Sequence, residues 1–357
     1  MGALANLVLY NAYQVIQSPN RIPDFFFFYA FGRIPWTDGP QHLYDPSIQH
    51  HAEQALMANA PFYEVINPPP FAWLLAPLTQ LPYPAALWLW TGAMIAAVAV
   101  SALLLAPPGI FPRILFTATW LGFLPAYLVV VSAPVAPLVI LSLAITWKLL
   151  DGDHPTAAGV VLALALLKPT LALLVPFALL AAGHRRLFLS WLASAVILVV
   201  ASLAWGVSAT QYVAMGAHVA SGSDYSLRWS LVPLIGDGLP WAVAAVVISA
   251  LTIWLAWKMR AHGPEVAITL GVMGSILVNH HMTPGDLMLF LVPIWLLLRV
   301  HQGVLSNALI GAAWVGAWLS PVFTVLAIVV AAAMPLGMFI GAFGPRRARR
   351  LSPIDVA

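Results

Sequence analysis

The sequence contains no cysteine and few charged residues. Without cysteine among its 357 residues, disulfide bonds, thiolate nucleophiles and cysteine-based metal sites are excluded. Only 8% of the residues are charged, against roughly 25% in a soluble domain, while 62% are hydrophobic. So few charges are too few to cover the surface of a soluble protein of this length. The composition therefore excludes a soluble cytoplasmic enzyme, a disordered chain and a nucleic-acid binder with a basic surface.

Long apolar runs are abundant instead. A membrane-spanning helix needs about 20 apolar residues. Such runs lie at 1–18, 84–106, 112–130, 134–150, 187–206, 240–258, 264–279, 285–300, 303–319 and 321–343, and we interpret the first as a retained helix. The segment 154–182 is divided by Lys168-Pro169 into two short crossings. The sequence predicts one integral membrane domain over 1–357, an all-α polytopic protein with about twelve transmembrane helices.

The basic residues predict the orientation of these helices. With the basic tail 344–357 in the cytoplasm, eleven of the fifteen Lys and Arg residues fall on the cytoplasmic side, as the positive-inside rule favours. Both termini are then cytoplasmic. Two longer polar segments, 19–67 and 207–239, face the outside, and we expect amphipathic loop helices in the first. Because every cytoplasmic loop is short, the chemistry is expected on the external face.

An acidic residue follows the first apolar run. Asp24 comes after Pro23 and before the aromatic run Phe25–Tyr29. A carboxylate at a membrane boundary loses hydration, and this raises its pKa toward the range of a general base. The alternative is a helix N-cap, in which the Asp24 carboxylate accepts hydrogen bonds from free backbone amides.

Further motifs follow Asp24 in a recognisable order. They are Tyr29, Gly32-Arg33, Leu43-Tyr44-Asp45-Pro46, Asn67-Pro68-Pro69-Pro70-Phe71, Ala76-Pro77-Leu78, Leu167-Lys168-Pro169-Thr170, Trp229-Ser230-Leu231 and Asp286-Leu287. The ordered set resembles glycosyltransferase family 87 of the GT-C superfamily, the polyprenyl-phosphate-mannose-dependent mannosyltransferases, over about residues 20–300. Two places depart from that pattern: Ser132-Ala133-Pro134 stands where the family often has Gly-Gln, and Asn279-His280-His281 where it usually has Ser-Pro.

This resemblance implies a GT-C-like fold and an inverting sugar transfer in the bacterial inner membrane, facing the periplasm. The donor would be a polyprenyl-phosphate sugar, with mannose favoured, and the acceptor a lipid or glycan among the membrane lipids. Asp24 matches the family's acidic residue and is the expected catalytic base. Because a phosphate leaving group needs no proton, one carboxylate suffices, and we expect neither a cofactor nor a metal ion.

Several cations are candidates for binding the donor phosphate or sugar. Lys168 lies between two short apolar helices, where a buried ammonium needs an anion such as a lipid phosphate, unless it snorkels to the interface. His280 and His281 precede the late helix, and Asp286 is expected to orient one of their rings. The alternatives for this pair are a metal site and plain interfacial histidines.

The remaining candidates are weaker. Arg33 and Arg228 either grip phosphate or pair with external carboxylates such as Asp38 and Asp224. Possible acceptor or groove residues are Tyr29, Asn67, Trp229 and Asp286. Asp45 is expected to form a turn before a helix at 47–60.

Two other classes of function stay open at this point. A carrier or flippase for a lipid-linked sugar would bind phosphate with the same cations and would need no base. A non-catalytic subunit of an envelope-synthesis complex would show no activity in isolation. The sequence alone gives neither the sugar, the acceptor nor the linkage.

Overall fold

The computed structural model describes residues 22–106, 114, 129–130, 132–222, 230–300, 304–319 and 324–339. Every regular element in these ranges is an α-helix or a 3-10 helix, which confirms the predicted all-α class. The predicted crossing at 1–18, nearly all of that at 112–130 and the basic tail 344–357 lie outside the described residues.

Among the described residues, three helices are long and apolar enough to cross a membrane: α5 (Tyr83–Leu105), α11 (Arg185–Ala204) and α15 (Leu239–Lys258). At 1.5 Å per residue each is about 30 Å long or slightly more, the thickness of the hydrocarbon core of a bilayer. Only 11% of the most apolar window of α11, and the same share of that of α15, is buried inside the protein. Apolar surface of this length is typical of contact with lipid, so the chain is a membrane protein; the count of twelve crossings stays a prediction.

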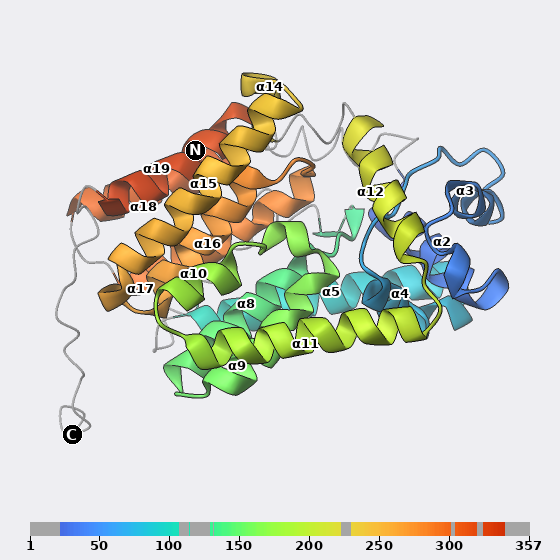
Figure 1. Ribbon diagram of the computed structural model, residues 1–357, viewed down its shortest axis with the longest axis horizontal. Coiled ribbons are helices and arrows are strands. Elements are labelled where there is room, and N and C mark those ends of the chain that lie inside the picture. Colours follow the sequence, from blue (N-terminus) through green and yellow to red (C-terminus); the bar gives the residue numbers. More distant parts are fainter. Residues whose placement is uncertain are drawn as a thin grey trace.

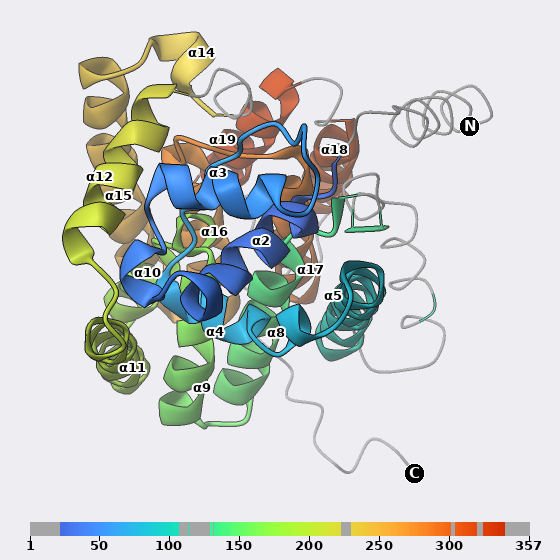
Figure 2. The same ribbon diagram turned by 90° about the vertical axis from the view of Figure 1, so that its right-hand side faces the viewer.

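The helices pack in two groups. In the first, α5 packs on α8 (Ala136–Asp151), α8 on α9 (Pro155–Leu162) and α9 on α11, so that Figure 2 shows α5 and α11 on opposite sides of α8 and α9. In the second, α15 packs on α16 (Pro264–Val278), which also contacts α17 (Leu291–Val300) and α19 (Thr324–Phe339); α18 (Val304–Leu319) packs on α17 and α19. Helix α10 (Val175–Ala181) joins the groups through α11, α15 and α16 (Figure 1).

The chain breaks at Lys168-Pro169, as expected, but the second half differs from the prediction. Helix α9 continues into the 3-10 helix η3 (Ala163–Leu167), and a 3-10 turn η4 (Pro169–Leu171) follows Lys168. The predicted short helix at 169–182 is therefore wrong: the α-helix begins only at Val175. Lys168 has φ −145° and ψ 78°, outside the helical region that a following proline disfavours.

The first polar segment folds against the end of α5. It contains α2 (Asp24–Thr37), η1 (Pro40–His42) and α3 (Pro46–Gln54), and it is followed by α4 (Pro69–Leu75) and η2 (Leu78–Gln80) before α5. Helix α2 differs from the expected amphipathic helix, because ten of its fourteen residues are buried, including the whole run Phe25–Phe28. Asp45 does cap α3, accepting hydrogen bonds from the backbone of Ser47 and Ile48, and that helix ends earlier than predicted. Figure 1 shows α2, α3 and α12 (Ala209–Gly222) together at one end of the molecule.

One departure from the family pattern has a local structural consequence. Ala133 of Ser132-Ala133-Pro134 has φ +48°, a left-handed conformation that glycine adopts more easily. The indole N–H of Trp90 on α5 donates to the Ala133 carbonyl at 2.9 Å. This bond holds the turn before α8 against α5.

Candidate active site

A cavity of about 680 Å³ lies between α2, α12, the start of α15 and the loop after α16. Its walls come from the start of α2, the extended segment 62–68, the Lys168 break, α12, the start of α15 and the loop between α16 and the 3-10 helix η6 (Pro284–Phe290). These elements are far apart in the sequence. The volume is within the range of pockets that hold small organic ligands.

Five of the predicted site residues line this one cavity: Asp24, Asn67, Lys168, His280 and His281. They come from four different elements of the chain. A carboxylate, an amide, an ammonium and two imidazoles thus share one volume, although nothing in their spacing along the sequence required it.

Asp24 is the first residue of α2. The N-cap position of this helix belongs to Pro23, so the alternative in which Asp24 is itself the N-cap does not hold. A carboxylate in the first turn is favoured by the positive end of the helix dipole. Asp24 and Phe28, one helical turn later, both line the cavity.

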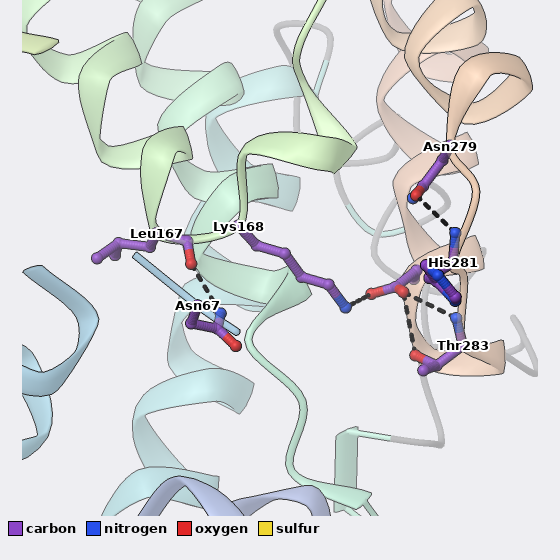
Figure 3. A network of polar contacts seen from close by, with 7 residues as sticks. Asn67, Leu167, Lys168, Asn279, His281 and Thr283 are labelled. Atoms are coloured by element: carbon purple, nitrogen blue, oxygen red, sulfur yellow. Dashed lines mark hydrogen bonds and ion pairs between the residues drawn. The ribbon is translucent and has the colours of Figure 1, made fainter. Parts of the chain in front are cut away.

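Lys168 pairs with a carboxylate of the protein itself. Its ammonium lies 2.5 Å from Asp286 Oδ1, and the Asp286 side chain is fully buried. The other oxygen of Asp286 accepts hydrogen bonds from the backbone N–H of Thr283 at 2.9 Å and from its hydroxyl at 3.1 Å (Figure 3). The expectation that Lys168 lacks an anion without a bound phosphate is therefore wrong, and so is the alternative that it snorkels away. An ammonium has three donors, so the pair with Asp286 does not exhaust Lys168.

Asn67 links the first polar segment to the Lys168 break. Its side-chain N–H donates to the Leu167 carbonyl at 2.8 Å (Figure 3), and its backbone carbonyl accepts from the Tyr44 hydroxyl at 2.7 Å. Tyr44 is almost fully buried. These bonds fix the wall that carries Asn67 relative to the wall that carries Lys168.

The two histidines form a hydrogen-bonded series with an acid that was not expected there. His280 Nε2 lies 2.7 Å from Asp237 Oδ1, and His280 Nδ1 lies 2.8 Å from His281 Nε2. The ring of Trp241 stands edge-on to His280, with centroids 4.7 Å apart. Asp237, rather than Asp286, is thus the carboxylate beside the histidine pair, which corrects the predicted orienting role of Asp286.

The electrostatics of this series favour a neutral His281. Burial, followed by the neighbouring His280, lowers the pKa of His281 to about 4. The hydrogen bond from His280 lowers the pKa of Asp237 below its ordinary value. At neutral pH the series therefore joins a carboxylate at the protein surface to an uncharged imidazole in the cavity wall.

Two predicted residues lie elsewhere, and two more fall outside the described residues. Tyr29 is buried and does not line the cavity, because its hydroxyl donates to the Leu81 carbonyl at 2.7 Å and holds α2 on the segment before α5. Arg33 follows Asp24 on α2 by nine residues, about 13 Å along the helix axis, and does not line the cavity either. Arg228 and Trp229 belong to the residues that the structure does not describe.

Asn279 and Asp237 were missed as site residues by the sequence analysis. Asn279 lines the cavity beside the two histidines that were singled out. Asp237 precedes α15 and is separated from His280 by 43 positions, so no local signal connects them. In the described part of the chain, no group of three or more histidine or acidic side chains has the arrangement of a metal site.

Comparison with known proteins decides the family. The model of glycosyltransferase family 87 matches residues 66–284, more than half of the chain. The chain belongs to glycosyltransferase family 87. It is therefore a membrane glycosyltransferase, and the family resemblance expected from the motifs is confirmed. No curated protein and no solved structure matches it.

The family 87 match covers part of the cavity. Asn67, Lys168, Asn279, His280 and His281 lie within the matched residues, whereas Asp24 and Asp286 lie outside them. The match thus includes the walls that carry the cations. For Asp24, the evidence is its position in the cavity wall.

Proposed function

We propose that the protein transfers a hexose from a polyprenyl-phosphate donor to a hydroxyl of a lipid or glycan acceptor, on the external face of a bacterial inner membrane. Mannose is favoured as the sugar by the motif resemblance. The observation that carries the proposal is the shared cavity of Asp24, Lys168 and the histidine pair in a family 87 membrane protein.

The proposed reaction is a single displacement with inversion. Asp24 takes the proton of the acceptor hydroxyl as the acceptor oxygen forms its bond to the anomeric carbon. The bond between that carbon and the phosphate oxygen breaks, and the electron pair leaves with the polyprenyl phosphate. The transition state resembles an oxocarbenium ion, as in glycoside hydrolysis.

Lys168 is the proposed ligand of the leaving phosphate. Asp286 holds its ammonium in the cavity wall, and the N–H groups that Asp286 does not use are donors for a phosphate oxygen. A charge held in place by the protein stabilises the developing negative charge without reorganisation during the reaction. The pair therefore supplies position as well as charge.

The apolar part of the cavity suits a lipid-linked substrate. Phe28, Ile66, Leu173 and Val219 line it together with the polar groups. Leu173 precedes α10, the helix that packs between the lipid-exposed helices α11 and α15. We propose that the polyprenyl chain enters from this side while the phosphate reaches Lys168.

The test is sugar transfer by the purified protein in nanodiscs, with radiolabelled polyprenyl-phosphate mannose as donor and a total lipid extract as acceptor. Asp24→Asn is expected to lower turnover by about 10²–10⁴-fold, the usual contribution of a general base, while donor binding persists. Asp38→Asn, at the other end of α2 and away from the cavity, is the matched control and should transfer normally.

Full transfer by Asp24→Asn would overturn the assignment of the base. Binding of mannose, glucose and arabinose donors without transfer by the unmodified protein would favour a carrier or a non-catalytic subunit. Loss of transfer on removal of divalent cations by EDTA would contradict the metal-free mechanism.

A further inference from the structure

We propose that Asn279 and Trp241 form the subsite for the transferred sugar, with the Asn279 amide and the Trp241 indole each donating a hydrogen bond to a sugar hydroxyl. The inference rests on the proposed function, since it names the part of the cavity that reads the donor's sugar. The observation that carries it is a pair of buried N–H donors that line the cavity and have no partner in the described part of the chain.

Asn279 is held with its donor unused. Its side chain is 97% buried, and its Oδ1 accepts the backbone N–H of His281 at 3.2 Å (Figure 3). Because the oxygen must face that N–H, the orientation of the amide is fixed and the NH2 group points the other way. Its Nδ2 is buried without a hydrogen bond to any described residue, an arrangement that costs free energy unless a ligand accepts from it.

Trp241 supplies the second donor. Its Nε1 is buried and has no hydrogen bond within the part of the chain that the structure describes, and its ring stands against His280, next to Asn279 in the chain. The two neutral donors, from α15 and from the loop after α16, thus belong to residues that line the same cavity. A buried tryptophan N–H ordinarily finds a partner, so its unused state also points to a ligand.

The chemistry of these donors suits a hydroxyl better than a phosphate. Both groups are uncharged, whereas phosphate is matched by the ammonium of Lys168. A site that hydrogen-bonds a hydroxyl discriminates strongly against a ligand without it, because the donors are then left unpaired. We therefore place the sugar at Asn279 and Trp241 and the phosphate at Lys168.

Thr269, on the helix α16 that ends just before Asn279, offers a matched control. Its hydroxyl is also buried and without a partner, but it lies ten residues earlier, about 15 Å along α16, and does not line the cavity. Thr269→Val removes an unpartnered polar group of the same kind away from the proposed subsite.

The experiment measures equilibrium binding to the protein in nanodiscs of three probes: polyprenyl-phosphate mannose, polyprenyl-phosphate glucose and polyprenyl phosphate without sugar. Asn279→Ala and Trp241→Phe, which keeps an aromatic ring, are each expected to weaken binding of a sugar-bearing probe about fivefold to tenfold, the effect of one lost hydrogen bond. Binding of plain polyprenyl phosphate should change less than about twofold, and Thr269→Val should change neither.

Equal weakening of all three probes would overturn the sugar assignment, because it would mean a phosphate contact or a disturbed loop. Unchanged binding of every probe in both variants would overturn the subsite altogether. If the unmodified protein binds none of the probes, the proposed function itself fails, a result distinct from a failure confined to the variants.

Discussion

Charged and aromatic side chains gather at both ends of α16. At the first turn they pair with one another, whereas at the other end one buried donor has no partner in the described residues. At the first turn of α16, the buried indole of Trp147 donates to Glu265 at 2.9 Å, and the Arg299 guanidinium stacks on Trp147 with 4.3 Å between its carbon and the ring centre. Arg299 also donates to the carbonyls of Leu105 and Ala106 at the end of α5. This cluster joins the ends of four helices, and we call it the basic end.

At the other end of α16 the polar groups are held in place, but not all of their hydrogen-bond donors have a partner in the described residues. Asp286 fixes Lys168, His281 fixes Asn279, and Asp237 lies against His280, yet the Asn279 amide nitrogen has no partner in the described residues. These groups border a cavity, whereas those of the basic end close on one another. The comparison teaches that charge and aromatic content alone do not mark a site; at α16 the distinguishing feature is an oriented, unpartnered donor on a residue that also lines a cavity.

The sharpest way to test the comparison is to remove Lys168. Lys168→Met leaves the carboxylate of Asp286 buried without its partner, and breaking a buried pair costs about 3–5 kcal/mol of stability. Adding Asp286→Asn removes the uncompensated charge and should restore most of the lost thermal stability. Donor binding should stay weak in both variants, because neither has the ammonium.

Thermal unfolding in detergent and donor binding in nanodiscs check these two effects separately. Lys148→Met is the control, since its pair with Asp151 is 2.9 Å long but exposed and should contribute less than about 1 kcal/mol. Recovery of binding in the double variant would mean that Lys168 serves only the fold.

The basic end is expected to show the reverse pattern. Arg299→Met removes hydrogen bonds to two carbonyls and the contact with Trp147, and should lower stability by about 2–4 kcal/mol. Transfer by the folded fraction should be unchanged, because the length of α16, roughly 20 Å, separates this end from the cavity.

The measurement is turnover normalised to the folded fraction, beside the unfolding temperature. Arg260→Met, an exposed cation of the loop before α16, should change stability by no more than about 0.5 kcal/mol. A loss of turnover in Arg299→Met at normal stability would break the contrast between the two ends.

The sequence predicted individual residues of the cavity wall more successfully than their hydrogen-bond and ion-pair partners. Lys168 was singled out because a charge in apolar surroundings is costly, and His280 and His281 because they precede the late helix; both properties can be read locally. Their partners depend on packing between segments far apart in the chain. Asp286 was assigned to the histidines at five or six positions' distance, whereas the fold gives it to Lys168, 118 positions away.

Two residues illustrate why packing overrides local pattern. Tyr29 follows four phenylalanines, and such an aromatic run predicts the wall of a groove. Its position on α2, however, directs its hydroxyl to the carbonyl of Leu81. Asn279 has no distinctive spacing, and its significance comes from a donor that the loop buries without a partner. An unpaired buried donor exists only in three dimensions, so no sequence pattern reports it.

A smaller effect distinguishes Glu265, at the basic end, from Glu53, a carboxylate on α3 that contacts the segment lining the cavity. Glu53 on α3 accepts the backbone N–H of Tyr63 at 3.3 Å, in the segment that lines the cavity, and its side chain is only 2% exposed. Unlike Glu265, which lies near Arg299 and its ring partner Trp147, Glu53 has neither a lysine nor an arginine paired with it in the described residues. Burial raises its pKa to about 7, against the ordinary value of 4.5.

The sign of the pH effect follows from these two pKa values. Between pH 4.5 and 7 the folded protein keeps the Glu53 proton that the unfolded chain releases, so this residue's contribution to stability is full below pH 4.5 and is lost as the pH rises through 7. His281 acts in the opposite sense, because its pKa of about 4 makes the folded state gain stability from pH 4 to 6.5. These two contributions oppose each other in the pH dependence of stability, so a variant is needed to separate them.

Glu53→Gln isolates the first term, since glutamine keeps an oxygen for the Tyr63 N–H and cannot ionise. Relative to the unmodified protein, this variant should gain up to about 3 kcal/mol of stability between pH 4.5 and 8. Unfolding temperatures of both proteins across this pH range give the difference. A constant difference would mean that Glu53 is ionised in the folded protein across this range, and it would contradict the raised pKa.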